Sequence, residues 1–110
     1  MKISKSREQE AYAIKFSAED SGKSVGRAYL YILKNDLHEE PFGFLEDVFV
    51  EEEYRQKGIG RALVEASITE AENLGCYKLI ATSRREKPEL HEWYKKFGFK
   101  DHGLEFRIDF

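Results

Sequence analysis

Seven residues near the middle of the chain have the types and spacing that a phosphate-binding loop needs. The stretch is Arg55-Gln56-Lys57-Gly58-Ile59-Gly60-Arg61. Glycines let a backbone approach an anion closely, and the first turn of a helix presents unpaired N–H groups that carry partial positive charge. Arg55, Lys57 and Arg61 add positive charge around them. If a helix follows, as its pattern indicates, these residues are predicted to hold a pyrophosphate at the helix start.

A lone Gly-x-Gly also has an ordinary explanation, which is a tight turn with basic residues facing solvent. The stretch lacks the Gly-Lys-Ser/Thr of a Walker loop, and it lacks the Gly-x-Gly-x-x-Gly of a dinucleotide fold. The context distinguishes it from a chance turn, because an apolar strand precedes it and an amphipathic helix follows.

The elements that must position this loop follow from the apolar patterning. Strands are predicted over residues 11–16, 25–33, 43–50 and 77–83, from residue 99 onward and over 104–110, and helices over residues 59–74 and 88–97. Turn chemistry at residues 19–23 makes the first two strands an antiparallel hairpin. The strand, helix and strand from residue 43 to 83 form a crossover, so those two strands are parallel. The prediction is an α/β (α+β) fold with a mixed sheet in the order β-β-β-α-β-α-β-β.

Two adjacent carboxylates, Glu46 and Asp47, interrupt the otherwise apolar strand over residues 43–50. Side chains alternate across a strand, so the two are expected to point to opposite faces. At least one of them should then meet solvent, a partner side chain or a ligand. A pair of structural salt bridges is the alternative to a chemical role.

The bulk properties bound the function. With 110 residues, the chain is expected to form a single domain over residues 1–110. A net charge of −3 disfavours nucleic acid as the partner. No run reaches the ~20 apolar residues of a membrane span, and the N-terminus does not resemble a signal peptide. The lone Cys76 excludes an internal disulfide and is read as a core residue, so we expect a cytoplasmic protein without membrane contact.

At this point the sequence resembles the GNAT superfamily of N-acetyltransferases. Residues 55–60 look like its Arg/Gln-x-x-Gly-x-Gly/Ala signature, and Trp93-Tyr94-Lys95-Lys96-Phe97-Gly98-Phe99 looks like its second signature, a Tyr on the last helix followed by Gly-Phe. The resemblance covers about residues 25–110. It implies acetyl-CoA as cosubstrate, no metal, and transfer of the acetyl group to a primary amine by direct attack.

The resemblance also implies roles for single residues. Backbone amides of residues 56–61 would hold the CoA pyrophosphate, and the backbone of Phe49 and Val50 would pair with the pantetheine arm, in a gap where the two parallel strands splay apart. Tyr94 would be the general acid, which suits a phenol with a pKa near ~10 facing a leaving thiolate whose thiol pKa is near ~8.5. The alternative for Tyr94 is a core tyrosine. Glu46 or Asp47, directly or through water, would take the proton of the amine.

The sequence departs from the family in two places. Lys87 stands where many members have an Asn that contacts CoA, and only ten residues precede the first strand. This reads as a minimal member whose acceptor pocket is open or is completed by another subunit, so monomer and homodimer both stay possible. The apolar C-terminal strand is a candidate for such a dimer contact.

The acceptor is left open between a small-molecule amine and a protein amine. Residues 45–48 and 74–78 resemble the corresponding segments of glucosamine-6-phosphate N-acetyltransferases, which gives a hint of subfamily only. Two alternatives to an enzyme stay open. One is a non-catalytic acyl-CoA-binding or regulatory module, and the other is a small interaction domain with a chance Gly-x-Gly turn.

Overall fold

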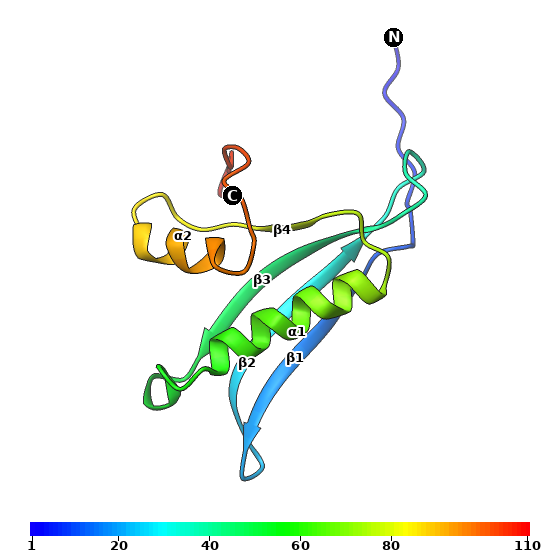
Figure 1. Ribbon diagram of the computed structural model, residues 1–110. Helices are drawn as coiled ribbons and strands as arrows, with labels where there is room; N and C mark the ends of the chain where they lie inside the picture. Colours follow the sequence, from blue (N-terminus) through cyan, green and yellow to red (C-terminus); the bar gives the residue numbers. More distant parts are fainter.

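A computed structural model describes residues 1–110 as one four-stranded mixed sheet with two α-helices. The elements are β1 (Tyr12–Asp20), β2 (Lys23–Leu33), β3 (Phe42–Val50), the short 3-10 helix η1 (Glu52–Tyr54), α1 (Ile59–Asn73), β4 (Leu79–Ala81) and α2 (Pro88–Lys95). The sheet order is β1-β2-β3-β4, with antiparallel pairs up to β3 and a parallel β3–β4 pair. In Figure 1, α1 lies across one face of the sheet, and α2 lies beyond the end of β4. The predicted fold class, the first four predicted strands and both predicted helices are confirmed.

The hairpin between β1 and β2 forms where turn chemistry predicted it. Ser21 and Gly22 both have left-handed backbone conformations, with φ values of 52° and 81°. Two consecutive positive φ values are the mark of the tight turn whose twist matches that of antiparallel strands. The hairpin places Ile14 and Phe16 of β1 among the apolar side chains packed beside α1.

Helix α1, which the sequence predicted to be amphipathic, packs its apolar stripe against the sheet. Leu63, Val64, Ser67 and Ala71 are buried. The Ser67 hydroxyl donates to the carbonyl of Leu63 at 2.8 Å, so the one polar member of the stripe is satisfied. After the helix, the N–H of Cys76 donates to the carbonyl of Ala71, and Gly75 has φ 78°, which together form a glycine C-cap.

A glycine on β2 sets how closely the start of α1 approaches the sheet. A Cβ added at Gly26 would lie 3.2 Å from the Ile59 side chain and 3.2 Å from the Phe49 carbonyl oxygen. A larger residue would push the beginning of α1 away from β2 and β3. Gly26 therefore fixes the position of the loop that precedes α1, although Gly26 lies far from that loop in the sequence.

The C-terminal part of the chain differs from the prediction. Helix α2 ends at Lys95, and residues 96–110 contain no strand, so the strands expected from residue 99 and over 104–110 are wrong. Alternating apolar residues form a strand only when a sheet edge is there to pair with them. The neighbouring strand β4 has only three residues, and no such pairing forms. Four large apolar side chains of this segment stay exposed: Leu104, Phe106, Ile108 and Phe110.

Neither helix combines the length and the apolar character that crossing a bilayer requires.

Candidate active site

The loop before α1 presents a row of free backbone N–H groups. Gln56 and Gly58 have positive φ values of 63° and 84°, which turn the backbone sharply into the helix. The first ladder bond of α1 runs from the N–H of Ala62 to the carbonyl of Gly58, at 3.0 Å. The N–H groups of residues 56–61 make no backbone hydrogen bond. Six consecutive free donors at a helix start are suited to binding a phosphate group.

The three basic side chains of the loop are arranged differently from one another. Arg55 donates from Nε to the carbonyl of Val50 at 2.8 Å, so its guanidinium ties the loop to the end of β3. Arg61 donates from Nε to Glu65 at 2.6 Å, one turn further along α1. Lys57 lies with Nζ 5.4 Å from the centre of the Tyr54 ring. Arg55 thus supports the loop structurally, whereas Lys57 and Arg61 are the cations left at its rim.

One edge of β3 has no strand partner beside the loop. β4 pairs with β3 only over Gly43–Leu45, while β2 pairs with β3 as far as Val50. The two parallel strands diverge beyond this point, as Figure 1 shows. The segment that contains Phe49 and Val50 is therefore open on the side toward α2. An extended molecule can lie along such an edge as an added strand.

A β-bulge lies at the carboxylate pair in the middle of β3. Tyr29 pairs with Glu46 and Arg27 pairs with Phe49, so two residues of β3 oppose one residue of β2. Asp47, within the bulge, has φ 54°. The strict alternation expected for this pair therefore fails at Asp47, which is exposed, while Glu46 is half-buried. Bulges re-aim side chains in this way next to active sites.

Tyr94 and Glu46 come from different elements, yet the charge of Glu46 acts on the Tyr94 hydroxyl. The half-buried Tyr94 ring lies 5.1 Å from the Trp93 ring and 5.6 Å from the Phe99 ring, between centroids. Burial raises the pKa of the Tyr94 hydroxyl, and the negative charge of Glu46 raises it further. The hydroxyl thus stays protonated at neutral pH and can donate a proton.

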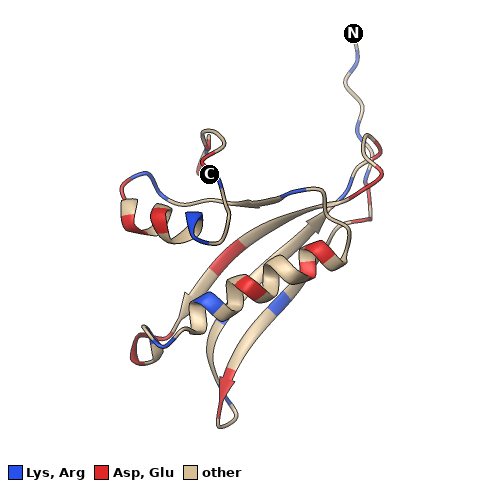
Figure 2. Ribbon diagram, in the orientation of Figure 1, with Lys and Arg blue, Asp and Glu red and all other residues tan.

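The pKa of Glu46 itself is raised, first by burial and then by the charges of Asp47 and Glu105, while Arg107 acts in the opposite direction. A carboxylate with a raised pKa is a stronger base once ionised. The site therefore combines a group that can donate a proton, Tyr94, with a group that can accept one, Glu46. Figure 2 shows the acidic pair as the red segment in the middle of β3, with the C-terminal segment on the same side as α2.

Residues 2–99 match the model of the acetyltransferase (GNAT) family. The chain belongs to the GNAT family of acetyltransferases. The loop over residues 55–61 (the anion loop), the open edge of β3 and Tyr94 all lie within the residues that the match covers.

Three GNAT relatives illustrate the similarity. Glucosamine 6-phosphate N-acetyltransferase of Trypanosoma brucei brucei is 34% identical over 95 residues, which is 86% of this chain and 63% of that protein. Aminoglycoside N(6')-acetyltransferase type 1 of Stenotrophomonas maltophilia is 31% identical over 83 residues, which is 73% of this chain and 54% of that protein. The crystal structure of glucosamine-6-phosphate N-acetyltransferase from Arabidopsis thaliana superposes with a TM-score of 0.80 at 26% identity, covering 89% of this chain and 67% of that one. The chain thus spans between about half and two-thirds of these relatives' length.

Two features of this GNAT chain were missed by the sequence analysis. Trp93 lies against the anion loop, because a Cβ added at Gly60 would be 3.7 Å from its ring. The hydroxyl of Ser83, just after β4, is buried without a hydrogen-bond partner. The Trp93 contact had a signal in the aromatic and basic residues of α2, whereas nothing in the sequence marks Ser83.

Proposed function

We propose that this chain is an acetyl-CoA-dependent N-acetyltransferase that moves the acetyl group to a primary amine by direct attack. The observation that carries the proposal is that β3 links a row of free N–H groups at one end to the groups that can transfer protons in its middle. At one end, six free N–H groups lie in the loop before α1 and in the first turn of α1. Glu46, whose charge acts on Tyr94, lies just beyond the point where the pairing of β3 with β4 ends. A donor with a pyrophosphate and a long arm matches this layout.

The residues present fit acetyl-CoA. The amides of residues 56–61 supply donors for its pyrophosphate, with Lys57 and Arg61 at the rim. The unpartnered edge of β3 at Phe49 and Val50 suits the amides of the pantetheine arm. Arg55 positions that edge through its bond to the Val50 carbonyl. The unpaired Ser83 hydroxyl, on the segment that leaves β4, is a further polar group that a bound molecule would satisfy.

In the proposed reaction, the amine nitrogen forms a bond to the acetyl carbonyl carbon, and the carbon–sulfur bond breaks. Glu46, directly or through a water, takes the proton that the amine loses. Tyr94 gives its proton to the departing thiolate sulfur. We assign the base to Glu46 rather than Asp47, because Glu46 lies close enough to raise the pKa of Tyr94, while Asp47 is exposed in the bulge.

For the acceptor we propose an amino sugar. Two relatives act, by their names, on glucosamine 6-phosphate and on aminoglycosides, which share an amine carried on a sugar ring. In this chain Tyr29 lies directly across from Glu46 in the β2–β3 register, and its ring stacks with that of Tyr31 at 6.3 Å. These rings offer an apolar surface beside the base on which a sugar ring can rest.

Calorimetric titration with acetyl-CoA is the first test, followed by release of free CoA thiol with a panel of amines. The panel contains glucosamine 6-phosphate, an aminoglycoside, a polyamine, a free amino acid and a peptide with a free N-terminus. Binding together with turnover on the sugar amines is the expected result. Absence of binding at millimolar acetyl-CoA would overturn the proposed donor, and turnover on the peptide alone would overturn the proposed acceptor.

A non-catalytic acyl-CoA-binding module is the second candidate. The observation that favours it is the exposure of the acceptor side, where Asp47 and the segment over residues 104–110 face solvent. It predicts acetyl-CoA binding without thiol release above background for every amine in the panel.

A further inference from the structure

Strand β1 forms one outer edge of the sheet and has a strand partner on one side only. It pairs with β2 along its whole length, Tyr12–Asp20, and the sheet order places no strand beyond it. In Figure 1, β1 lies on the side of the sheet opposite β4 and α2. The backbone N–H and C=O groups along its outer edge are therefore without a strand to pair with. A strand of nine residues with such an edge is a template for pairing with another chain.

An apolar groove lies beside this edge, between β1 and the first half of α1. Its volume is about 280 Å³, and all but one of its lining residues are hydrophobic. Phe16 and Ala18 line it from the strand, and Ile59, Ala62 and Ala66 line it from the helix. Ala62 and Ala66 are exposed, and side chains this small let a second helix approach α1 closely. The groove and the free strand edge therefore suit one partner that brings both a strand and an apolar surface.

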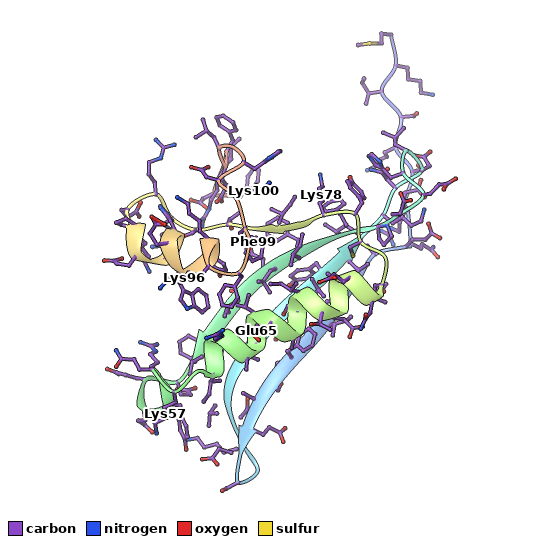
Figure 3. All side chains as sticks on the ribbon, in the orientation of Figure 1. Lys57, Glu65, Lys78, Lys96, Phe99 and Lys100 are labelled. Carbon is purple, nitrogen blue, oxygen red and sulfur yellow. The ribbon has the colours of Figure 1, made fainter.

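The charges on the helix side of the groove are already paired with each other. Between Ile59 and Ala66, α1 carries two charged residues, Arg61 and Glu65. Arg61 Nε lies 2.6 Å from a carboxylate oxygen of Glu65, which Figure 3 labels on α1. A partner that covers this part of the helix therefore meets an ion pair and no isolated charge.

The sequence of β1 is complementary to itself when it is reversed about Ser17. If two copies of β1 pair antiparallel with Ser17 opposite Ser17, then Lys15 lies opposite Glu19 and Phe16 lies opposite Ala18, and the two-fold symmetry makes each pair twice. Opposite charges placed directly across two strands stabilise their pairing. Neither Lys15 nor Glu19 makes a salt bridge within the chain, so both are available.

We propose that two copies of this chain associate through their β1 edges, in the antiparallel register centred on Ser17, and so join their two sheets into one. Residues directly opposite each other share a face of the joined sheet. Phe16 and Ala18 of both copies then lie on the face that carries the two α1 helices, and the two apolar grooves face each other across the two-fold axis. Lys15 and Glu19 form their pairs on the opposite face. This interface does not depend on the proposed reaction.

The test measures self-association by sedimentation equilibrium over a range of protein concentrations. Wild-type protein is expected to form a dimer. Glu19→Lys places two lysines opposite each other at both symmetric positions, so it should raise the dissociation constant of the dimer by about 10- to 100-fold. The double variant Lys15→Glu with Glu19→Lys exchanges the two charges and should restore the wild-type association. Glu39→Lys makes the same change of charge in the loop between β2 and β3, and this matched control should associate like the wild type.

Three results would overturn the proposal. Wild-type protein that stays monomeric at millimolar concentration is one, as expected if the chain's own N-terminal residues or an unrelated peptide covered the β1 edge. A dimer that Glu19→Lys leaves intact is the second, since another surface must then hold it. Failure of the double variant to restore the dimer is the third, because it excludes the register centred on Ser17. Lys15 and Glu19 are exposed, so the variants should fold, and matching circular dichroism spectra check this.

Discussion

The loop before α1 and the proton-transfer pair are built in contrasting ways. The loop is a contiguous run of residues whose free donors come from the backbone, and it begins a helix with four buried residues. Tyr94 and Glu46 lie 48 positions apart in the sequence. Tyr94 comes from α2, which has no fully buried residue, and Glu46 comes from β3 beside its bulge. One region depends on local backbone geometry, and the other on the docking of a lightly packed helix.

This difference indicates how binding and chemistry can vary separately on one scaffold. A site made of backbone donors tolerates changes of side chain as long as the turn keeps its conformation and stays packed against the sheet. A site made of two distant side chains fails when either element shifts, and lightly packed elements open most easily. Substitutions around Tyr94 should therefore change turnover more than donor affinity, and substitutions around Gly26 should do the reverse.

The largest expected effect is on turnover in Tyr94→Phe. Loss of the proton donor should lower turnover by about 10²- to 10⁴-fold, the range typical of general acid catalysis, with little change in acetyl-CoA affinity. Steady-state kinetics and calorimetry measure the two quantities. Tyr77→Phe is the control, because Tyr77 packs against His38 and Phe42 and not against the Tyr94–Glu46 pair. Unchanged turnover in Tyr94→Phe would remove this residue from the mechanism.

The next effect is on donor affinity in Gly26→Ala. The added Cβ would press on Ile59 and on the Phe49 carbonyl, so we expect a loss of stability of about 1–3 kcal/mol together with weaker acetyl-CoA binding. Urea unfolding and calorimetry measure the two changes.

Gly22→Ala provides the comparison for Gly26→Ala. Gly22 has φ 81° and open space around it, so its replacement costs about 1–2 kcal/mol of backbone strain at a distance from the loop. Acetyl-CoA affinity should then be unchanged. If both variants weaken acetyl-CoA binding equally, then affinity depends on global stability and not on how the loop packs against β2.

Sequence reasoning predicted the parts of the fold whose conformation is set by residues close together in the sequence. The helix over residues 59–74, its amphipathic character and the turn within residues 19–23 depend on residues within a few positions of one another. The parallel neighbours β3 and β4 followed from the handedness and length of the crossover. These parts include β3 and α1, the two elements that flank the loop over residues 55–61.

The same reasoning failed where the outcome depends on distant partners. The bulge at Asp47 is a property of the β2–β3 register, which no pattern within β3 reveals. The alternation over residues 104–110 indicated a strand, but a strand also needs an edge to pair with. The contact of Trp93 with Gly60 depends on how α2 docks. The first two lie on the proton-transfer side of the molecule, and the third is where α2 docks against the loop.

A moderate effect is expected on the ionisation of Tyr94 in Glu46→Gln. The charge of Glu46 raises the Tyr94 pKa by disfavouring a second negative charge, so its removal should lower that pKa. NMR titration of tyrosines carrying ¹³C next to the hydroxyl follows the change. Asp47→Asn is the matched control and should leave the Tyr94 pKa nearly unchanged. An equal shift in both variants would mean that the two carboxylates act together, and the base could no longer be assigned to Glu46 alone.

The smallest expected effect is on stability in Phe106→Ser. The Phe106 side chain is 88% exposed, so its removal should change the free energy of unfolding by less than about 0.5 kcal/mol. Phe97→Ser should lose clearly more, because Phe97 packs against the core cluster and the Trp93 ring. Urea unfolding at several protein concentrations measures both. A large loss in Phe106→Ser that grows with protein concentration would mean that a second copy covers the segment over residues 104–110. The region around Tyr94 and Glu46 would then be covered by a second copy. The contrast between a lightly packed and a well-packed region would hold only for the isolated chain.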